Sequence, residues 1–337
     1  VLVYTIVKER LKCGSIEEAV MNTMHRIEGA YSLVVMSPRK LIAARDPHGF
    51  RPLCIGLLDN DCYIFASETC ALDALGAKFI RDVEPGEVCV VENGELRSMH
   101  CGIECKSSAC VFEYIYFARP DSIIDGASVE LARQEAGKYL SIEHPVGADV
   151  VIGVPDSGIP AAIGYAKFSG IPYGVGLIKN RYIARTFIQP GQDKRERSVR
   201  LKLNALRTAV EGKRVIMVDD SIVRGTTSGK IVRMLRAAGA KAVYMCVSSP
   251  PIGYPCFYGI DTSIRKELIA ATKSVEEIRE FIGADSLHFL SIEGLKKCVP
   301  NLKADDMCYA CFNSAYPIED GAKPAGNSKY VFEQRKC

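Results

Sequence analysis

The chain has 337 residues, enough for two domains that each bury a core. Hydrophobic residues make up 48% and charged residues 25%, as in ordinary globular proteins. The formal net charge of +3 is too small to favour general nucleic-acid binding, and no apolar run reaches the roughly 18 residues that span a bilayer. The composition therefore predicts a soluble, cytoplasmic protein with neither nucleic acid nor membrane as a partner.

Fourteen cysteines are many for such a chain. Disulfide scaffolds are small, loop-rich and secreted, whereas this sequence has long apolar strands and amphipathic helices. Most of the cysteines lie inside apolar runs, where we expect small buried hydrophobic side chains rather than ligands. Examples are Cys54, Cys62, Cys89 and Cys246.

Residues 1–100 predict a helix followed by short strands. Ser15 and Glu18 are spaced as a capping box ahead of the amphipathic stretch AVMNTMHRI. The apolar runs YSLVVM, KLIAARD, PLCIGLL, CYIFASE and EVCVV are joined by turns, which indicates an antiparallel sheet and an α+β fold. Because the chain opens at Val1 inside the apolar run VLVYTIV, we expect it to begin within a domain.

From about residue 107 the pattern changes to strands that alternate with helices. The apolar runs VVIGVP, IPYGVGLI, RVIMVDD and AVYMCVS predict strands of a parallel sheet covered on both faces. Such sheets bind ligands at the carboxyl ends of their strands. We expect an α+β domain over residues 1–106, an α/β domain over 107–320 and a mobile tail over 321–337.

The strongest chemical signal is the segment 215–228, VIMVDDSIVRGTTS. Four apolar residues form a strand, after which Asp219 and Asp220 emerge side by side. Adjacent buried carboxylates need a cation or a polyhydroxyl ligand to stay ionised, and hard oxygen ligands suit Mg²⁺. Gly225 and the hydroxyl residues after it begin a helix, where backbone N–H groups bind anions. The segment predicts a ribose phosphate site; a solvated Asp-Asp turn is the alternative.

Two further segments fit the same site. Residues 153–160, GVPDSGIP, form a small-residue turn between a strand and a helix, where backbone can approach a diphosphate. The segment from Lys179 to Lys202 carries eight Lys or Arg against Asp193 and Glu196. We interpret it as a lid over an anionic substrate. A solvated basic face and an RNA-contacting patch are the alternatives.

One cysteine motif stands outside the apolar runs. Cys308 and Cys311 form a CxxC in a polar stretch, which by itself fits half of a zinc site, a redox pair or coincidence. Four thiolates hold zinc or an iron–sulfur cluster, so a metal site here needs two more ligands. Cys101 and Cys105 lie near Cys110 in the sequence and are one source of zinc ligands.

These motifs together resemble the glutamine phosphoribosyl-diphosphate amidotransferases, which are type I phosphoribosyltransferases. The resemblance rests on CVFEYIYFARPDS, GVPDSG, KNRYIARTFIQPGQ, VIMVDDSIVRGTTS, PCFYGIDT and CYACF, in the family's order up to about residue 320. It implies a glycosyltransferase (pentosyltransferase) of purine synthesis, of the glutamine amidotransferase family. Such an enzyme forms 5-phosphoribosylamine, diphosphate and glutamate from phosphoribosyl diphosphate, glutamine and water. The resemblance also suggests a homotetramer.

By this resemblance Ser157, Asp219 and Asp220 would form the Mg²⁺ site. The implied substrate-binding residues are Asp156, Ser157, Gly158, Lys179, Arg185, Asp219, Asp220, Ser221, Gly225, Thr226, Thr227 and Ser228. Some members of the family carry a structural [4Fe–4S] cluster, and their ligands match Cys110, Cys256, Cys308 and Cys311. Cys246 is a rival ligand, but it lies in a strand outside the PCFYGID context.

The first region resembles the later part of the family's glutaminase, an N-terminal-nucleophile hydrolase domain, here incomplete. The matching segments are RDPHGFRPL, FASETCA and EPGE. That chemistry uses a Cys as first residue with its own α-amino group as base, whereas this chain opens with Val1. Cys13 and Cys70 are interpreted as packed cysteines. We therefore expect no glutaminase nucleophile in this chain, and transfer that depends on ammonia alone.

Two other functions share some of these features. A nucleobase phosphoribosyltransferase would have the same acidic pair and diphosphate turn, but it needs neither the N-terminal α+β region nor the cysteine set. A regulator that senses phosphoribosyl diphosphate and binds nucleic acid would show a helix-turn-helix or a broad basic face. Retention on heparin or DNA at moderate salt would distinguish that regulator from the enzyme.

Overall fold

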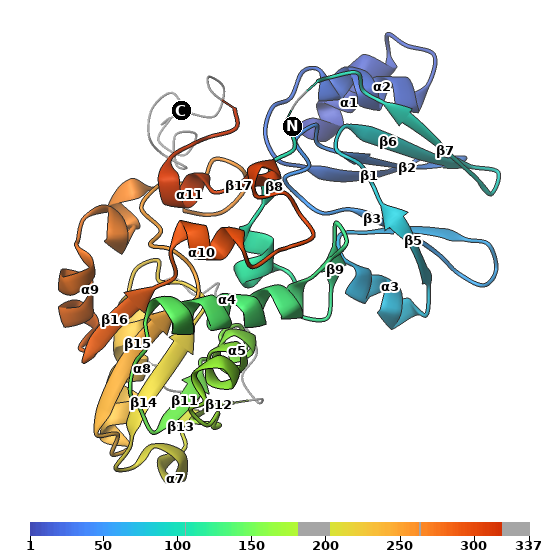
Figure 1. Ribbon diagram of the computed structural model, residues 1–337. Helices are drawn as coiled ribbons and strands as arrows, with labels where there is room; N and C mark the ends of the chain where they lie inside the picture. Colours follow the sequence, from blue (N-terminus) through green and yellow to red (C-terminus); the bar gives the residue numbers. More distant parts are fainter. Residues whose placement is uncertain (105, 181–202, 263, 319–337) are drawn as a thin grey trace.

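A computed structural model of the chain describes residues 1–104, 106–180, 203–262 and 264–318 (Figure 1). The N-terminal elements form one layered unit and the later elements form a second unit around a parallel sheet. The tail expected over 321–337 lies outside the described residues. Within them, no helix has both the length and the apolar character that crossing a membrane requires.

The first unit stacks two helices on a four-stranded antiparallel sheet of order β1-β2-β6-β7. Alternate β2 residues point to opposite faces: Ile42 and Ala44 pack beneath the helices, whereas Ala43 packs against a second sheet of order β4-β3-β5. The elements are α1 (Leu2–Arg10), α2 (Ile16–Met24), β1 (Ser32–Met36), β2 (Lys40–Arg45), β3 (Cys54–Leu57), β4 (Tyr63–Ala66), α3 (Thr69–Leu75), β5 (Lys78–Asp82), β6 (Glu87–Glu92) and β7 (Glu95–His100).

The start of α2 follows the predicted cap in part. The Ser15 hydroxyl accepts a hydrogen bond from the Glu18 backbone N–H at 3.2 Å. The Glu18 carboxylate accepts from the backbone N–H of Gly14 rather than from that of Ser15. The helix therefore begins at Ile16, and both side chains satisfy N–H groups at its end.

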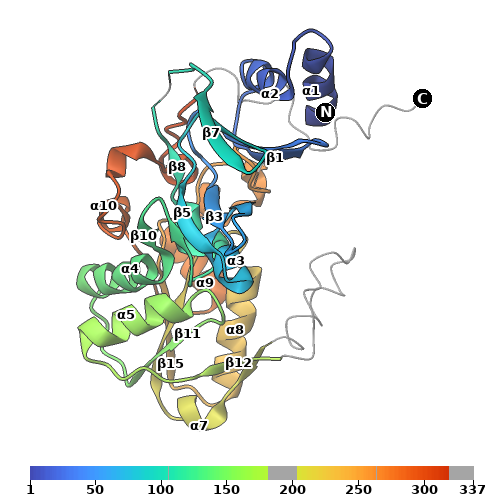
Figure 2. The ribbon, with the colours of Figure 1, turned by 90° about the vertical axis from the view of Figure 1, so that its right-hand side faces the viewer.

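The second unit has a four-stranded parallel sheet of order β11-β14-β15-β16. Its strands are β11 (Val150–Gly153), β14 (Arg214–Asp219), β15 (Ala242–Val247) and β16 (Ser286–Phe289). Helices α4 (Val129–Glu143) and α5 (Ile159–Ser169) cover one face, while α8 (Thr226–Ala237) and α9 (Val275–Ile282) cover the other (Figure 2). The predicted three-layer α/β arrangement is confirmed.

One predicted strand differs from the structure. The run IPYGVGLI was expected to join the parallel sheet, yet only Tyr173 forms a parallel bridge, with Val151. Its end, β12 (Leu177–Lys179), pairs antiparallel with β13 (Leu203–Ala205). The glycines of this run lie against β11: a Cβ at Gly176 would approach the Ile152 side chain to 2.6 Å. The run therefore packs over the β11 side chains instead of adding a full ladder.

Short elements connect the two units. Strands β8 (Ala109–Cys110) and β17 (Met307–Cys308) pair in parallel, and β9 (Ile123–Ile124) pairs with β10 (Ala127–Ser128). A π-helix spans Glu113–Phe117. The remaining helices are α7 (Arg207–Val210), α10 (Ile292–Lys296), α11 (Ala310–Asn313) and the 3₁₀ turns Arg265–Glu267, Ile269–Ala271 and Ala304–Asp306.

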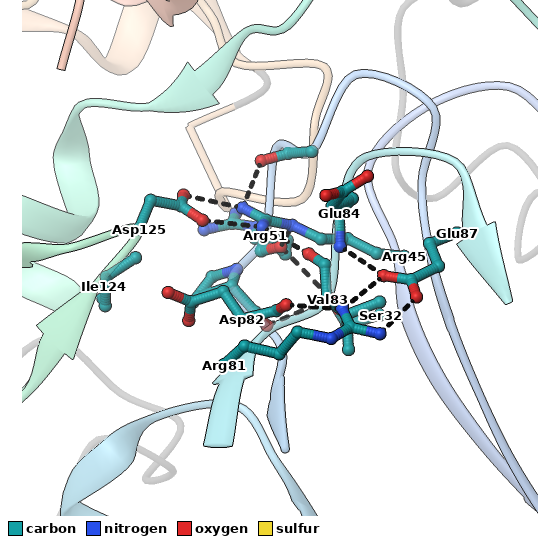
Figure 3. Close-up of polar contacts among 12 residues, drawn as sticks. Ser32, Arg45, Arg51, Arg81, Asp82, Val83, Glu84, Glu87, Ile124 and Asp125 are labelled. Atoms are coloured by element: carbon teal, nitrogen blue, oxygen red, sulfur yellow. Dashed lines mark hydrogen bonds and ion pairs between the residues drawn. The ribbon is translucent and has the colours of Figure 1, made fainter. Parts of the chain in front are cut away.

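A buried ion pair joins the two units (Figure 3). Arg45, at the end of β2 and 2% exposed, donates to both carboxylate oxygens of Asp125, each at 2.8 Å. Asp125 lies in the turn between β9 and β10. The guanidinium also donates to the carbonyl oxygens of Val83 at 2.8 Å and Gly49 at 3.0 Å. Together with the bond from its Nε to the Arg51 carbonyl at 2.8 Å, these contacts use all five N–H donors of the guanidinium, so the pair fixes the β9–β10 turn against the first unit.

We expect the loss of Arg45 from the Arg45–Asp125 pair to be costly for stability. Removing one partner of a buried pair leaves the other charge uncompensated, so Arg45→Met should lower the free energy of unfolding by about 3 kcal/mol. The matched control is Arg214→Met, which breaks the exposed pair with Asp149 and should cost less than about 1 kcal/mol. Urea denaturation followed by circular dichroism measures both, and equal losses would contradict the interpretation.

The neighbouring Asp82 should make stability depend on pH. Burial, and next the Asp125 carboxylate, raise the pKa of Asp82 from 3.8 to about 6, against the opposing charge of Arg45. Between these values the folded state holds a proton that the unfolded state has released, so stability falls as pH rises through the window.

The Asp82→Asn substitution removes this titration. From pH 4 to pH 6 the Asp82→Asn variant should therefore become progressively more stable relative to the parent chain. Above pH 6 the difference between their free energies of unfolding should stay constant. Urea denaturation at a series of pH values measures it. A difference that does not change with pH in this range would show that the Asp82 carboxylate keeps its ordinary pKa.

Candidate functional site

The two adjacent carboxylates lie at the carboxyl edge of the parallel sheet. Asp219 ends β14 and Asp220 follows it; they are 8% and 6% exposed. The Asp220 backbone N–H donates to the Asp219 carboxylate at 3.0 Å. The Asp219 carbonyl accepts from the Ser248 backbone N–H at 2.9 Å, which ties the end of β14 to the end of β15. The sheet therefore fixes the backbone that carries both acids.

Burial and mutual repulsion make both acids hard to ionise. Burial, and then the neighbouring Asp220 charge, raise the pKa of Asp219 well above its ordinary value. Burial also raises the pKa of Asp220, although hydrogen bonds from the hydroxyls of Ser157 and Ser221 and the charge of Arg133 oppose it. Two carboxylates in this setting call for a cation, and an all-oxygen donor set fits Mg²⁺.

The loop after β14 leads into the amino end of α8. Gly225 is the N-cap residue and has φ +72°, a left-handed conformation that favours glycine. Thr226 and Thr227 are exposed in the first turn, whereas Ser228 is buried. A 12-residue helix presents unpaired backbone N–H groups here, beside two exposed hydroxyls. This end of α8 can bind a phosphate group.

The turn after β11 lies beside the acidic pair. The Val154 N–H donates to the Val218 carbonyl at 2.9 Å, and the Gly158 N–H donates back to the Val154 carbonyl at 2.9 Å. A Cβ at Gly158 would lie 2.4 Å from the Val218 carbonyl oxygen, so only glycine lets the turn pack this close. The peptide bond between Pro155 and Asp156 is cis. Strand pairing thus places Ser157 within hydrogen-bonding reach of Asp220.

The basic segment is described only at its start. Lys179 ends β12 and forms an ion pair with Asp156, which is 70% exposed at the tip of the β11 turn. Arg185, and the expected lid over residues 181–202, lie outside the described residues. The structure therefore brings Lys179 to the candidate site from a segment far along the chain.

Arg133 was not among the residues expected at the site. It lies on α4, is 3% exposed, and donates to the carbonyls of Tyr114 at 3.0 Å and Ala118 at 2.7 Å. Its charge favours the ionised form of Asp220. One signal in the sequence points to it: Arg133 interrupts an apolar helical stripe that includes Val129 and Leu140.

The four expected cluster cysteines come from three segments that meet at the junction of the units. Cys110 and Cys308 are directly paired between β8 and β17. Cys311 lies in α11, and Cys256 lies in the loop after β15. Burial raises the pKa of Cys110 to about 12 and that of Cys308 to about 11, and the charges of all four thiols act on one another.

The rival cysteines lie elsewhere. Cys246 belongs to the core between the parallel sheet and α4, and Cys101 to the core of the first unit. Cys105 is outside the described residues. All described cysteines are free thiols.

The arrangement of the four thiols bears on which metal they fit. Within the described ranges, no three His, Cys, Asp or Glu side chains are arranged to hold one metal ion. Thiolates around one zinc ion converge, because each Zn–S bond is about 2.3 Å. In a four-iron cluster each thiolate binds a different iron, so the ligands surround a larger body. Neighbouring but unconverged thiols suit the larger group.

A cavity of about 520 Å³ lies elsewhere on the same edge of the sheet. His144, Arg265 and His288 contribute its polar lining, and its walls include segments after β15 and β16. Neither Asp219 nor Asp220 borders it. We place the candidate site at the acidic pair because carboxylates, hydroxyls and a helix end meet there, whereas the cavity is mostly apolar.

Comparison with known proteins separates the same two units. The protein-family model described as a glutamine amidotransferase domain matches residues 7–74, and the family model described as a phosphoribosyl transferase domain matches residues 130–251. These matches agree with the expected fold classes: an N-terminal glutaminase-like domain followed by a phosphoribosyltransferase domain with a parallel sheet.

Several whole-chain relatives share most of this sequence. The amidophosphoribosyltransferase of Bacillus subtilis is 55% identical over 309 residues, which cover 90% of this chain and 64% of that protein. The chain thus spans just under two thirds of that relative's length. The amidophosphoribosyltransferase of Archaeoglobus fulgidus is 52% identical, covering 93% of this chain and 70% of the relative.

A solved structure has the same fold. The glutamine phosphoribosylpyrophosphate amidotransferase from B. subtilis, complexed with ADP and GMP, matches with a TM-score of 0.87 and 53% identity, over 94% of this chain and 70% of that one. Because the match covers 94% of this chain, it extends across both units. The chain therefore belongs to the amidophosphoribosyltransferase family.

Proposed function

We propose that this chain carries the phosphoribosyl-transfer half of an amidophosphoribosyltransferase. In this reaction ammonia attacks the anomeric carbon of phosphoribosyl diphosphate, forms the C–N bond of 5-phosphoribosylamine and displaces diphosphate. The observation that carries the proposal is the meeting of Asp219 and Asp220 with the amino end of α8 and the β11 turn at one edge of the sheet. In the whole protein, glutamine and water would supply the ammonia and leave glutamate.

Each part of the edge has a role in this proposal. Gly225, Thr226, Thr227 and Ser228 would bind the 5-phosphate, with Ser221 beside them. The acidic pair would face the ribose hydroxyls, and the backbone around Asp156, Ser157 and Gly158 would contact the diphosphate, with Lys179 adding positive charge. Such positioning and charge stabilisation suffice for this transfer, because no protein nucleophile is needed.

Ser157, Asp219 and Asp220 would hold Mg²⁺. The two buried carboxylates repel each other without a cation, which is why they fit one, and the Ser157 hydroxyl lies within hydrogen-bonding reach of Asp220. When bound, the ion would neutralise charge on the departing diphosphate. Arg133 would keep Asp220 ionised for this purpose.

Cys110, Cys256, Cys308 and Cys311 are the proposed ligands of a [4Fe–4S] cluster, with zinc as the other candidate. Their positions on β8, β17, α11 and the loop after β15 support a structural role. The cluster would link the C-terminal segment to the start of the second domain. The transfer reaction itself involves no oxidation or reduction.

The wider assignment follows from family membership. We propose a glutaminase-like domain over residues 1–106, a phosphoribosyltransferase domain over 107–320 and a tail over 321–337. A homotetramer is proposed from the family resemblance, and the cytoplasm is proposed as the location because its free thiols suit a reducing compartment. The plant relatives from Arabidopsis thaliana are named chloroplastic.

The proposed transfer can be tested on this chain directly. With phosphoribosyl diphosphate and Mg²⁺ present, we expect diphosphate release when ammonium chloride is added. Release that requires adenine, guanine or another nucleobase would instead identify a nucleobase phosphoribosyltransferase.

Loss of either acid should abolish the transfer without unfolding the chain. Asp219→Asn or Asp220→Asn should lower the rate of ammonia-dependent diphosphate release by roughly 100-fold or more. Melting temperatures should not fall, because each substitution removes one of two buried carboxylates that repel each other. The matched control, Asp149→Asn, lies at the opposite edge of the same sheet in an exposed ion pair and should keep its activity. Full activity in both acid variants would refute this site assignment.

A further inference from the structure

The first domain forms one wall of the thiol site. The segment His48–Arg51 follows β2 and runs beside the cysteines of the second domain. Phe50, only 1% exposed, stacks on Tyr258 with ring centroids 4.3 Å apart and shares a small core with Cys308. The Phe50 carbonyl accepts from the Cys110 backbone N–H at 3.1 Å. Both domains thus contribute backbone and side chains around the thiols.

Arg51 is held at this boundary by groups of the second domain. It donates to the Glu113 carboxylate at 2.6 Å and to the Tyr258 carbonyl at 3.1 Å. Its guanidinium lies 5.4 Å from the centroid of the Phe117 ring. Its own carbonyl accepts from the Arg45 Nε at 2.8 Å, which connects it to the buried Arg45–Asp125 pair (Figure 3). The guanidinium is therefore fixed in place.

Hydrogen bonds connect the surroundings of Arg51 to the thiols. Tyr258, whose carbonyl accepts from Arg51, donates its own backbone N–H to the Cys256 sulfur at 3.3 Å, and Phe50, the residue before Arg51, accepts from the Cys110 backbone N–H. Metal binding requires thiolates, so each ligand must release its proton to solvent. Four thiolates that gather at this junction concentrate negative charge where solvation is poor, and a fixed guanidinium offsets part of that cost.

We propose that Arg51 supplies a fixed positive charge that offsets the negative charge of the four metal-bound thiolates, so that the first domain helps to build the metal site of the second. The inference rests on the proposed assignment of Cys110, Cys256, Cys308 and Cys311 as ligands. It makes Arg51 a positioning residue for the metal site, and it makes metal retention depend on how the two domains dock. Groups that support metal ligands typically change metal affinity 10- to 100-fold when removed.

The test measures metal retention rather than enzyme activity. The 337-residue chain and its variants are reconstituted anaerobically with iron and sulfide. Iron and acid-labile sulfide per chain are then determined, together with the rate of iron release to a chelator. Arg51→Met should release iron roughly 10-fold faster or more, and Arg51→Lys, which keeps the charge, should release it more slowly than Arg51→Met.

Two controls separate charge from packing. Arg51→Met leaves Glu113 buried without its partner, so the double variant Arg51→Met/Glu113→Gln removes that orphaned charge as well. It should still release iron fast, whereas Glu113→Gln alone should retain it. Arg81→Met breaks a comparable ion pair with Glu87, at 2.6 Å within the first domain, and should release iron at the parent rate.

The outcomes are distinct. Restored iron retention in the double variant, parental retention in Arg51→Met, or equally fast release from Arg81→Met would each overturn the role of Arg51. If the parent chain takes up zinc instead of iron, faster zinc release from Arg51→Met supports it. A parent chain that binds neither metal overturns both this inference and the ligand assignment. Ammonia-dependent diphosphate release is measured separately, so the proposed transferase function stands or falls independently.

Discussion

The structure of the candidate site depends on one electrostatic constraint: two neighbouring carboxylates are buried at the end of a strand. Asp219 and Asp220 cannot both stay charged there without compensation. The surrounding chain supplies part of it through the hydroxyls of Ser157 and Ser221 and through the charge of Arg133. What remains is a demand for a cation, which is why the proposed function has Mg²⁺ and the diphosphate of the substrate bind at this edge.

Strand pairing and close backbone packing bring distant segments together at this edge of the sheet. Parallel pairing sets Gly153 beside Val218, so the turns after β11 and β14 emerge together. The Gly158 backbone is close enough to the Val218 carbonyl to exclude any side chain. Arg133 reaches the edge from α4 while it holds carbonyls of the π-helix region, and π-helical turns are frequent at functional sites. Site and scaffold are thus connected through the same few contacts.

Much of the second unit and of its acidic edge was predictable from the sequence, because hydrophobic periodicity and short motifs involve residues that are close together in the chain. Unbroken apolar strands that alternate with helices predicted the parallel sheet, and the run from Val215 to Ser228 predicted the acidic pair at its edge. The sequence did not predict that IPYGVGLI leaves the sheet, because that depends on how closely its glycines pack on β11. Arg133 was not predicted, because its role depends on which backbone carbonyls pack against α4, and the tertiary fold decides that. For Arg185 the interpretation remains a prediction.

Polar contacts at the junction between the domains connect the first domain to the region of the acidic site. The guanidinium of Arg45 fixes the β9–β10 turn, and its Nε holds the carbonyl of Arg51. Arg51 in turn holds Glu113, the first residue of the π-helix whose carbonyls Arg133 contacts. A series of polar contacts therefore runs from the first domain, past the thiol site, to Arg133, whose charge acts on Asp220. Contiguity alone does not establish energetic coupling. Coupling can be measured by varying residues of this series in pairs. If Arg45 and Asp220 act independently, the effects of their substitutions on the free energy of unfolding will add, and if the junction has two arrangements, they will not.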